Sequence, residues 1–167
     1  MLNKKVFVTV GTTAFDKLVE TILSRDVLEA LSSRGYNDLT LQIGKTFLVP
    51  DCTPRYGFVN ISYFNLDASI AKFVHSADLI ISHAGAGSIL DALEARKHLI
   101  VVTNEKLMNN HQLELAEQLY QDLHLYHCNC DTLLSLINTM DLTKLQPFVN
   151  DKSKKIANYI DEIMGFS

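Results

Sequence analysis

Short apolar runs alternate with segments of helical periodicity along almost the whole chain. Six runs have the length and composition of strands: KVFVTV (5–10), DLTLQI (38–43), GFVNIS (57–62), DLIIS (78–82), HLIVVT (98–103) and LYHCN (125–129). DLIIS and HLIVVT are almost continuously apolar, which is typical of strands that are buried on both faces of a sheet.

The segments between these runs predict helices. One helix has an apolar stripe from Leu18 to Leu31, and further helices are expected over residues 66–77, 86–97, 108–123 and 131–140. Strands that alternate with crossover helices form a parallel sheet with helices on both faces. We therefore expect a single Rossmann-like α/β domain over residues 1–150.

The C-terminal segment, residues 151–167, predicts an amphipathic helix. Ile156, Tyr159, Ile160, Ile163 and Met164 repeat at helical spacing and form one apolar stripe. Such a stripe either docks on a partner protein or packs on its own domain, and the sequence alone leaves both open.

Composition narrows the classes of partner. Of the 167 residues, 47% are hydrophobic and 20% are charged, which is typical of a globular domain. The net charge of −4 argues against nucleic acid as the main partner, because phosphate backbones select basic surfaces. The sequence has no apolar run near the roughly 20 residues that a membrane-spanning helix needs. Any association with a membrane is therefore expected to come through a partner.

The cysteines favour free thiols. Cys52, Cys128 and Cys130 are odd in number and lack the spacing of a disulfide framework, which favours a reducing compartment. The pair Cys128 and Cys130 has no second pair with which to complete a tetrahedral metal site, so we expect no bound metal.

In parallel α/β sheets, ligands bind where strands lead into helix N-termini at the carboxyl edge. The first such junction is TVGTTAFD, where Gly11 and Thr12 follow the first strand. Glycine lets the backbone approach an anion. A simple turn at Gly11, with Asp16 as a helix cap, explains the same residues equally well. The junction lacks the G-x-G-x-x-G pattern of nicotinamide- and flavin-binding enzymes, so that class is set aside.

The second junction, ISHAGAGSILDAL, is the most informative. Small residues at a helix N-terminus form a cradle of N–H donors that suits a diphosphate. His83 and Ser88 can add donors, and Asp91 can accept hydrogen bonds from ribose hydroxyls. The structural alternative is tight helix–strand packing at Gly85 and Gly87, with Asp91 favoured by the helix dipole. The cluster of features favours the binding site.

The third junction, VVTNEKLMNNHQLELA, carries side chains that suit a sugar. Amide and imidazole groups both donate and accept hydrogen bonds, so they can hold several hydroxyls. Capping by an asparagine would explain one of them, but not the whole set. The candidates here are Asn104, Glu105, Asn110, His111 and Gln112. We assign structural or surface roles to His75, His98, His124 and His127.

Together, the runs FVTVGTTAFD, HAGAGSILDAL and IVVTNEKLMNNHQLELA resemble a known family. It is the catalytic subunit of the eukaryotic UDP-N-acetylglucosamine transferase that adds the second sugar to dolichol-linked oligosaccharide. That subunit is similar to the C-terminal, donor-binding half of the bacterial enzyme that adds N-acetylglucosamine to lipid II precursors. The resemblance covers nearly the whole chain and implies one lobe of a metal-independent, inverting transferase of GT-B architecture.

The resemblance also implies roles and partners. The donor would be UDP-N-acetylglucosamine, without a cofactor, and the acceptor a lipid-linked N-acetylglucosamine diphosphate. A separate membrane-anchored subunit would bind that acceptor on the cytosolic face of the endoplasmic reticulum. By motif position, the donor–acceptor cleft would be faced by Gly11 and Thr12, the diphosphate held by Gly85, Ala86, Gly87 and Ser88, the ribose by Asp91, and the sugar by His111 and Gln112.

Three points stay open at this stage. The general base that deprotonates the acceptor is either His83 or a group on the partner. The sugar is the second, because a related split enzyme of bacterial exopolysaccharide synthesis would transfer another sugar, such as galactose, to another polyprenyl-linked acceptor. The third is turnover itself, because a non-catalytic nucleotide-sugar-binding module would carry the same binding residues.

Overall fold

The computed structural model describes residues 3–67, 69–104 and 110–148. Within these residues, six parallel strands form one sheet in the order β3-β2-β1-β4-β5-β6. The chain runs outward from β1 to one side and then returns to continue on the other, so the order reverses between β1 and β4. The strands are β1 (Lys4–Thr9), β2 (Tyr36–Gln42), β3 (Asn60–Phe64), β4 (Leu79–His83), β5 (His98–Thr103) and β6 (Tyr126–Asn129).

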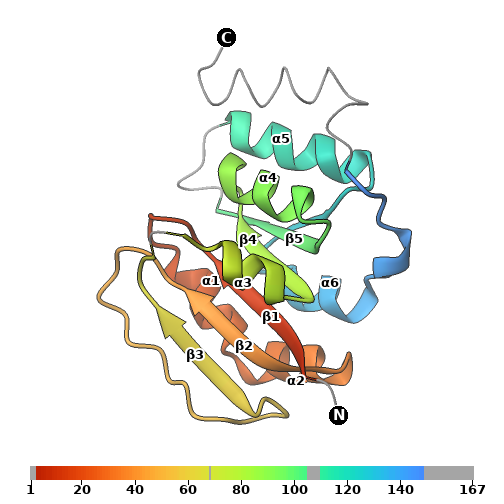
Figure 1. Ribbon diagram of the computed structural model, residues 1–167. Coiled ribbons are helices and arrows are strands. Elements are labelled where there is room, and N and C mark those ends of the chain that lie inside the picture. The colour runs from red at the N-terminus through yellow and green to blue at the C-terminus, as the bar shows by residue number, and fades with distance from the viewer. Residues whose placement is uncertain (1–2, 68, 105–109, 149–167) are drawn as a thin grey trace.

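Helices cover both faces of this sheet (Figure 1). One face packs against α1 (Asp16–Ile22), α2 (Arg25–Ser33) and α6 (Leu133–Thr139). The other face packs against α3 (Ala71–Ser76), α4 (Ala86–Glu94) and α5 (Asn110–Gln121). A 3₁₀ helix, η1 (Leu142–Lys144), follows α6. The predicted class, a Rossmann-like α/β domain with a parallel sheet, is confirmed.

Alternation along the strands explains the two cores. In β1, Val6 and Val8 enter the core under α1 and α2, whereas Phe7 enters the core under α3 and α4. In β4, Ile81 and Ile80 divide in the same way. Successive side chains of a strand point to opposite faces, so a strand with helices on both sides is apolar along most of its length. This is why the central strands are continuous apolar runs.

The prediction of one helix from Leu18 to Leu31 is wrong. The chain leaves helical geometry at Ser24, whose φ of −66° and ψ of 151° are extended, and Ser24 is the N-cap of α2. Asp16 is the first residue of α1 rather than its cap, and its carboxylate accepts a hydrogen bond from the Thr46 hydroxyl at 2.9 Å.

Two further elements are displaced from their predicted positions. The third strand begins at Asn60 rather than at residue 57, because Gly57, at a φ of 90°, lies in a turn closed by the hydrogen bond from Phe58 N to Arg55 O. The helix predicted over residues 66–77 begins only at Ala71. Asp67 accepts from Ser69 N at 3.2 Å, and this local turn competes with helix formation.

The amphipathic helix predicted for residues 151–167 lies outside the described residues. Among the helices that are described, none has the length and apolar character needed to cross a bilayer.

Candidate functional site

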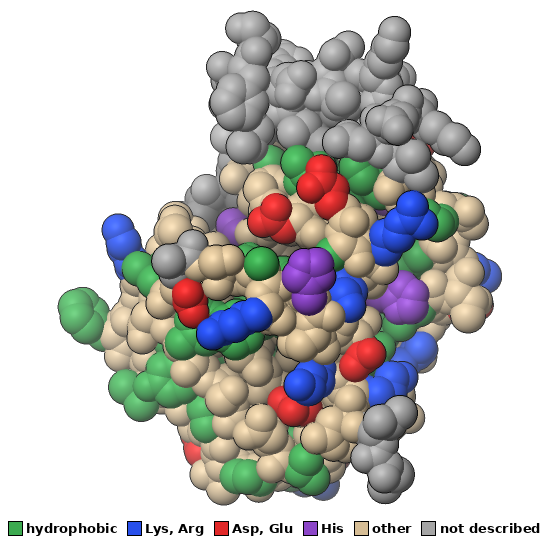
Figure 2. Space-filling view, in the orientation of Figure 1, with side chains coloured by type: hydrophobic (Ala, Val, Ile, Leu, Met, Phe, Trp, Pro, Cys, Tyr) green, Lys and Arg blue, Asp and Glu red, His purple; other side chains and the backbone are tan. Residues whose placement is uncertain are grey.

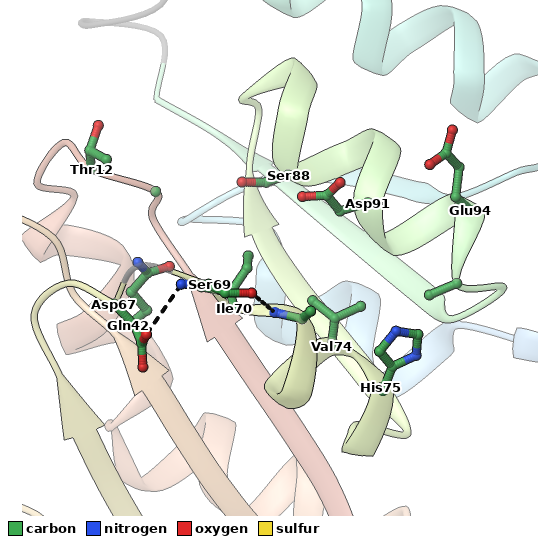
Figure 3. Close-up of a pocket in the computed structure, with 13 residues that line it drawn as sticks. Thr12, Gln42, Asp67, Ser69, Ile70, Val74, His75, Ser88, Asp91 and Glu94 are labelled. Carbon is green, nitrogen blue, oxygen red and sulfur yellow. Dashed lines mark hydrogen bonds between the residues drawn. The ribbon is translucent and has the colours of Figure 1, made fainter.

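A cleft of about 640 Å³ opens at the carboxyl edge of the sheet, next to the reversal of strand order between β1 and β4 (Figure 3). Gly11 and Thr12 line it from the turn after β1, and Ser88 and Asp91 line it from α4. In Figure 3, Ser88 and Asp91 project from one side of α4 into the same space. The tertiary structure therefore brings together candidates from the first and second junctions of the sequence.

Buried hydrogen bonds hold the Gly11 turn against the sheet. Gly11 has a φ of 68°, a left-handed conformation that favours glycine. Its N–H donates to the Thr9 hydroxyl at 3.2 Å, and that hydroxyl donates to the Gln42 amide oxygen at 2.5 Å. Thr9 and Gln42 are both buried, and Gln42 also lines the cleft. The turn is thus fixed by groups that the sheet itself positions.

The N-terminus of α4 faces the cleft through a short run of small residues. Gly85 is the N-cap, with an extended φ of −78° and ψ of 127°, and the helix has no side-chain cap. The first N–H groups of a helix lack partners within the helix and carry partial positive charge. Ser88 lies in this first turn and Asp91 one turn later, which gives a donor and then an acceptor along one side of the helix.

The two glycines of this run have different surroundings. A Cβ atom on Gly85 would lie 2.3 Å from His83 Cε1, whereas a Cβ on Gly87 would have no atom within 4 Å. A Cβ on Gly11 would also meet the His83 ring, 2.7 Å from Nε2. Packing on His83 therefore explains Gly11 and Gly85. Packing does not explain Gly87, where the open space suits a ligand.

Burial changes the chemistry of His83. Desolvation lowers its pKa from 6.5 to about 4, so the imidazole is neutral at neutral pH. A neutral imidazole can still donate one hydrogen bond to a phosphate, but it brings no charge. It is also a weak general base, because effective bases titrate near the working pH.

A second cavity of about 410 Å³ adjoins the cleft and suits a sugar. Thr12 lines both spaces, and the second is also lined by Thr13, His83, Asn104 and Gln112. Hydroxyl, imidazole and amide side chains from the ends of β1, β4 and β5 and from the start of α5 thus meet in one space, although they are far apart in the sequence. Such groups can satisfy several sugar hydroxyls.

The candidates of the third junction fall in different places. Asn104 and Gln112 line the second cavity, whereas His111 is exposed at the start of α5. Asn110 is the first residue of α5, and its side chain lies outside the described part of the structure, as does the whole of Glu105. A sugar-binding role for these residues stays a prediction.

Several residues that line the cleft were missed by the sequence analysis. Asp67, Ser69 and Ile70 come from the segment before α3, and Glu94 comes from the end of α4. His75, which was assigned a structural or surface role, also lines the cleft. One signal was available, because Asp67 and Ser69 follow a predicted strand in a pattern typical of a polar turn. The position of α3 beside α4 has no comparable signal in the sequence.

The cysteines are free thiols, as predicted. Burial raises the pKa of the Cys128 thiol to about 12, so it stays protonated and is a poor metal ligand. Among the described residues, no three His, Cys, Asp or Glu side chains are placed to hold a metal ion.

Comparison with known proteins identifies the family. Residues 5–163 match the glycosyltransferase family 28 C-terminal domain. The chain belongs to this family. The UDP-N-acetylglucosamine transferase subunit ALG13 of Kluyveromyces lactis is 33% identical and covers 95% of this chain, which in turn covers 97% of that relative. Human ALG13 is 50% identical over 130 residues, but the matched region is 78% of this chain and only 11% of the human protein.

Solved structures agree with the family assignment. An NMR structure of ALG13 superimposes with a TM-score of 0.69 at 25% identity, covering 96% of this chain and 94% of that one. MurG from Acinetobacter baumannii superimposes with a TM-score of 0.63 at 18% identity, covering 96% of this chain but 46% of MurG. The shared fold therefore makes up less than half of the MurG chain.

Proposed function

We propose that this chain is the donor-binding catalytic subunit of a heteromeric, inverting glycosyltransferase. It transfers N-acetylglucosamine from UDP-N-acetylglucosamine to N-acetylglucosaminyl-diphosphodolichol during synthesis of the N-glycan precursor. The observation that carries the proposal is the nearly full-length match to a relative that is named a UDP-N-acetylglucosamine transferase subunit. The mammalian relatives are much longer than this chain, so the activity of those whole proteins enters only as support.

The two adjoining cavities suggest how the donor lies. The uridine occupies the 640 Å³ cleft, with its base against the apolar side chains of Ile70 and Val74. Asp91 accepts hydrogen bonds from the ribose hydroxyls. A volume of about 640 Å³ lies within the range of small-molecule sites, and both polar and apolar side chains line the cleft.

The diphosphate lies where the two cavities meet. Thr12 lines both spaces, Gly11 and Ser88 line the larger one, and the His83 ring lies beside both Gly11 and Gly85. Backbone N–H groups and the Ser88 hydroxyl stabilise the negative charge that grows on the diphosphate as it leaves. This arrangement supplies the stabilisation without a metal ion. The N-acetylglucosamine then extends into the second cavity, toward Asn104 and Gln112.

In the transfer step, an acceptor hydroxyl oxygen forms a bond to C1 of the sugar while the bond from C1 to the diphosphate breaks. The acceptor proton passes to a general base, and UDP leaves with the bonding electrons. His83 is neutral but weakly basic, so we assign the base to the subunit that binds the acceptor. That subunit is anchored in the membrane and recruits this chain to the cytosolic face of the endoplasmic reticulum.

A titration of the isolated chain tests the donor site. We expect saturable NMR shifts at Gly87, Ser88, Asp91 and Gln112 with UDP-N-acetylglucosamine, and weaker shifts at Gln112 with UDP-galactose or UDP. Asp91→Asn keeps the size of the side chain but removes its charge, and it should weaken all three ligands. Equal shifts with all three ligands would argue against selection of N-acetylglucosamine by this lobe. An absence of shifts at millimolar ligand would contradict a donor site on the isolated chain.

A transfer assay tests the catalytic role. We expect transfer to a dolichol-linked acceptor only when the membrane-anchored subunit is present. Binding of the donor without transfer in the presence of that subunit would favour a non-catalytic module instead.

A further inference from the structure

The connection between β2 and β3 exposes two large apolar side chains at one end. Phe47 is fully exposed, at 104%, and Val49 is 77% exposed. The residues between and beside them, Thr46, Leu48 and Pro50, are turned inward. Alternate side chains of an extended segment point in opposite directions, so Lys45, Phe47 and Val49 form one outward ridge. We call these three residues the Phe47 ridge.

The inward side chains fix the ridge in place. The Thr46 hydroxyl donates to Asp16 at 2.9 Å and accepts from Leu48 N at 3.1 Å, and Leu48 packs against the core. The Asn65 amide donates to the carbonyl oxygens of Gly44 and Thr46, at 3.0 and 3.4 Å. The exposure of Phe47 is therefore a property of a well-held segment.

The ridge is attached to the candidate donor site. Lys45 N donates to Thr12 O at 3.3 Å, and Thr12 lines both cavities. Figure 1 shows the connection leaving the carboxyl edge of the sheet, where β2 ends, and reaching the amino edge, where β3 begins. In the same orientation, hydrophobic side chains project from the left side of the molecule, where the connection between β2 and β3 runs (Figure 2). Phe47 and Val49 follow Thr46 and so belong to the part of the connection nearest the site.

The geometry of transfer indicates what covers this edge. The acceptor hydroxyl must reach C1 of a sugar held at the carboxyl edge, so the molecule that holds the acceptor must contact that edge. In MurG, more than half of the chain lies outside the matched lobe, since the match covers 46% of it. The relative of which this chain covers 97% is named a subunit, and the proposed function accordingly assigns the acceptor to a separate chain.

A membrane fits the same surface less well. The ridge carries one cation, Lys45, and the carboxylate of Asp51 follows two residues after Val49. The chain as a whole has a net charge of −4, which gives no attraction to anionic headgroups. A protein surface with an apolar pocket suits a fixed phenylalanine better, because aromatic side chains are the usual anchors of interfaces.

We propose that the Phe47 ridge is a docking surface for the acceptor-binding subunit, with Phe47 and Val49 as its apolar anchors. This inference rests on the proposed function and adds a contact beside the donor site. It is independent of the C-terminal segment.

Site-specific cross-linking tests the contact. The photo-reactive amino acid p-benzoylphenylalanine replaces Phe47 in the full chain, co-expressed with the membrane-anchored subunit of the same transferase. Val59, which is 62% exposed at the amino edge, provides the matched control position. We expect a cross-link to the subunit from position 47 and none from position 59. A cross-link from position 47 to lipid, to a second copy or within the chain itself would overturn the proposal, as would equal cross-linking from both positions.

Affinity provides a second test. Phe47→Ser with Val49→Ser should weaken the purified complex at least about tenfold, and Val59→Ser should leave its affinity unchanged. The melting temperature and the affinity for UDP-N-acetylglucosamine should stay as in the unmodified chain, because neither residue packs in the core. Unchanged affinity for the subunit with intact donor binding would overturn the docking surface alone. If the unmodified chain does not bind UDP-N-acetylglucosamine, that result would instead overturn the proposed function.

Discussion

The two edges of the sheet differ in how deeply their polar groups are buried. At the carboxyl edge, four strands each carry one buried polar side chain at their last or second-last position. These residues are Thr9, Gln42, Ser82 and Thr103. Each has a hydrogen-bond partner within the fold. At the amino edge, polar contacts are exposed, as in the hydrogen bond from Lys5 N to Asp78 at 2.8 Å, except that the buried Asp38 accepts a part-buried hydrogen bond from the Asn60 amide at 3.1 Å.

This difference separates the site from its support. A buried polar group costs free energy unless its partner is in place, so a row of them demands an accurate arrangement. At the carboxyl edge that arrangement fixes the Gly11 turn and presents Gln42 to the cleft. At the amino edge, the side chains only have to exclude water from the core. Changes at the carboxyl edge should therefore alter function or stability strongly, and matched changes at the amino edge weakly.

The largest effect is expected at Asp91. Asp91→Ala removes the acceptor for the ribose hydroxyls and should reduce transfer at least about a thousandfold, or about 4 kcal/mol. His111→Ala should also abolish transfer if this side chain binds the sugar. Both residues are exposed, so the melting temperature should hardly change. Steady-state kinetics with the partner subunit present measure the loss. Full activity in both variants would contradict the site assignment.

A glycine at each edge gives a matched pair for stability. Gly44, at a φ of 73°, would place a Cβ 2.4 Å from the Thr13 carbonyl oxygen, whereas Gly35, at a φ of 94°, would place one 3.5 Å from Lys4 Cδ. Both alanine variants strain the backbone by about 1–2 kcal/mol, and the clash in Gly44→Ala adds about 1–3 kcal/mol. Urea unfolding should show the larger loss for Gly44→Ala. Equal losses would mean that the backbone at Thr13 moves away from the added methyl group at little cost in free energy.

The neutral state of His83 predicts a pH dependence. Its pKa is lowered from 6.5 to about 4, so between these values the unfolded chain binds more protons than the folded one. The free energy of unfolding should be highest above pH 6.5 and fall as the pH approaches 4, by up to about 2–3 kcal/mol. His83→Gln, which does not titrate, should remove this part of the slope. An NMR titration that places the pKa near 6.5 would contradict the burial argument.

The smallest effect is expected at the amino edge. Asp78→Ala removes the exposed acceptor of Lys5 N and should cost about 1 kcal/mol or less, because water can replace the lost partner. Transfer by this variant should match that of the unmodified chain at 25 °C. A loss of transfer comparable to that of Asp91→Ala would break the distinction between the two edges.

Much of this architecture could be predicted from the sequence because the signals are local. The apolar runs placed β1, β4 and β5 to within one residue at each end, since a strand with helices on both faces is apolar along most of its length. The glycine turn at Gly11 and the small residues before Ser88 were also visible, because a turn or a helix start depends on neighbouring residues. These features marked the carboxyl edge as the place to look.

Only the tertiary structure decided which residues share the cleft. Asp67 and His75 join Asp91 because α3 lies beside α4, a packing of side chains that no local pattern encodes. Gly85 and Gly87 are identical residues two positions apart, yet His83 fills the space beside the first and leaves the second open. Local propensity determines which secondary structure a segment adopts. The free space beside a residue is instead determined by side chains from segments that are distant in the chain.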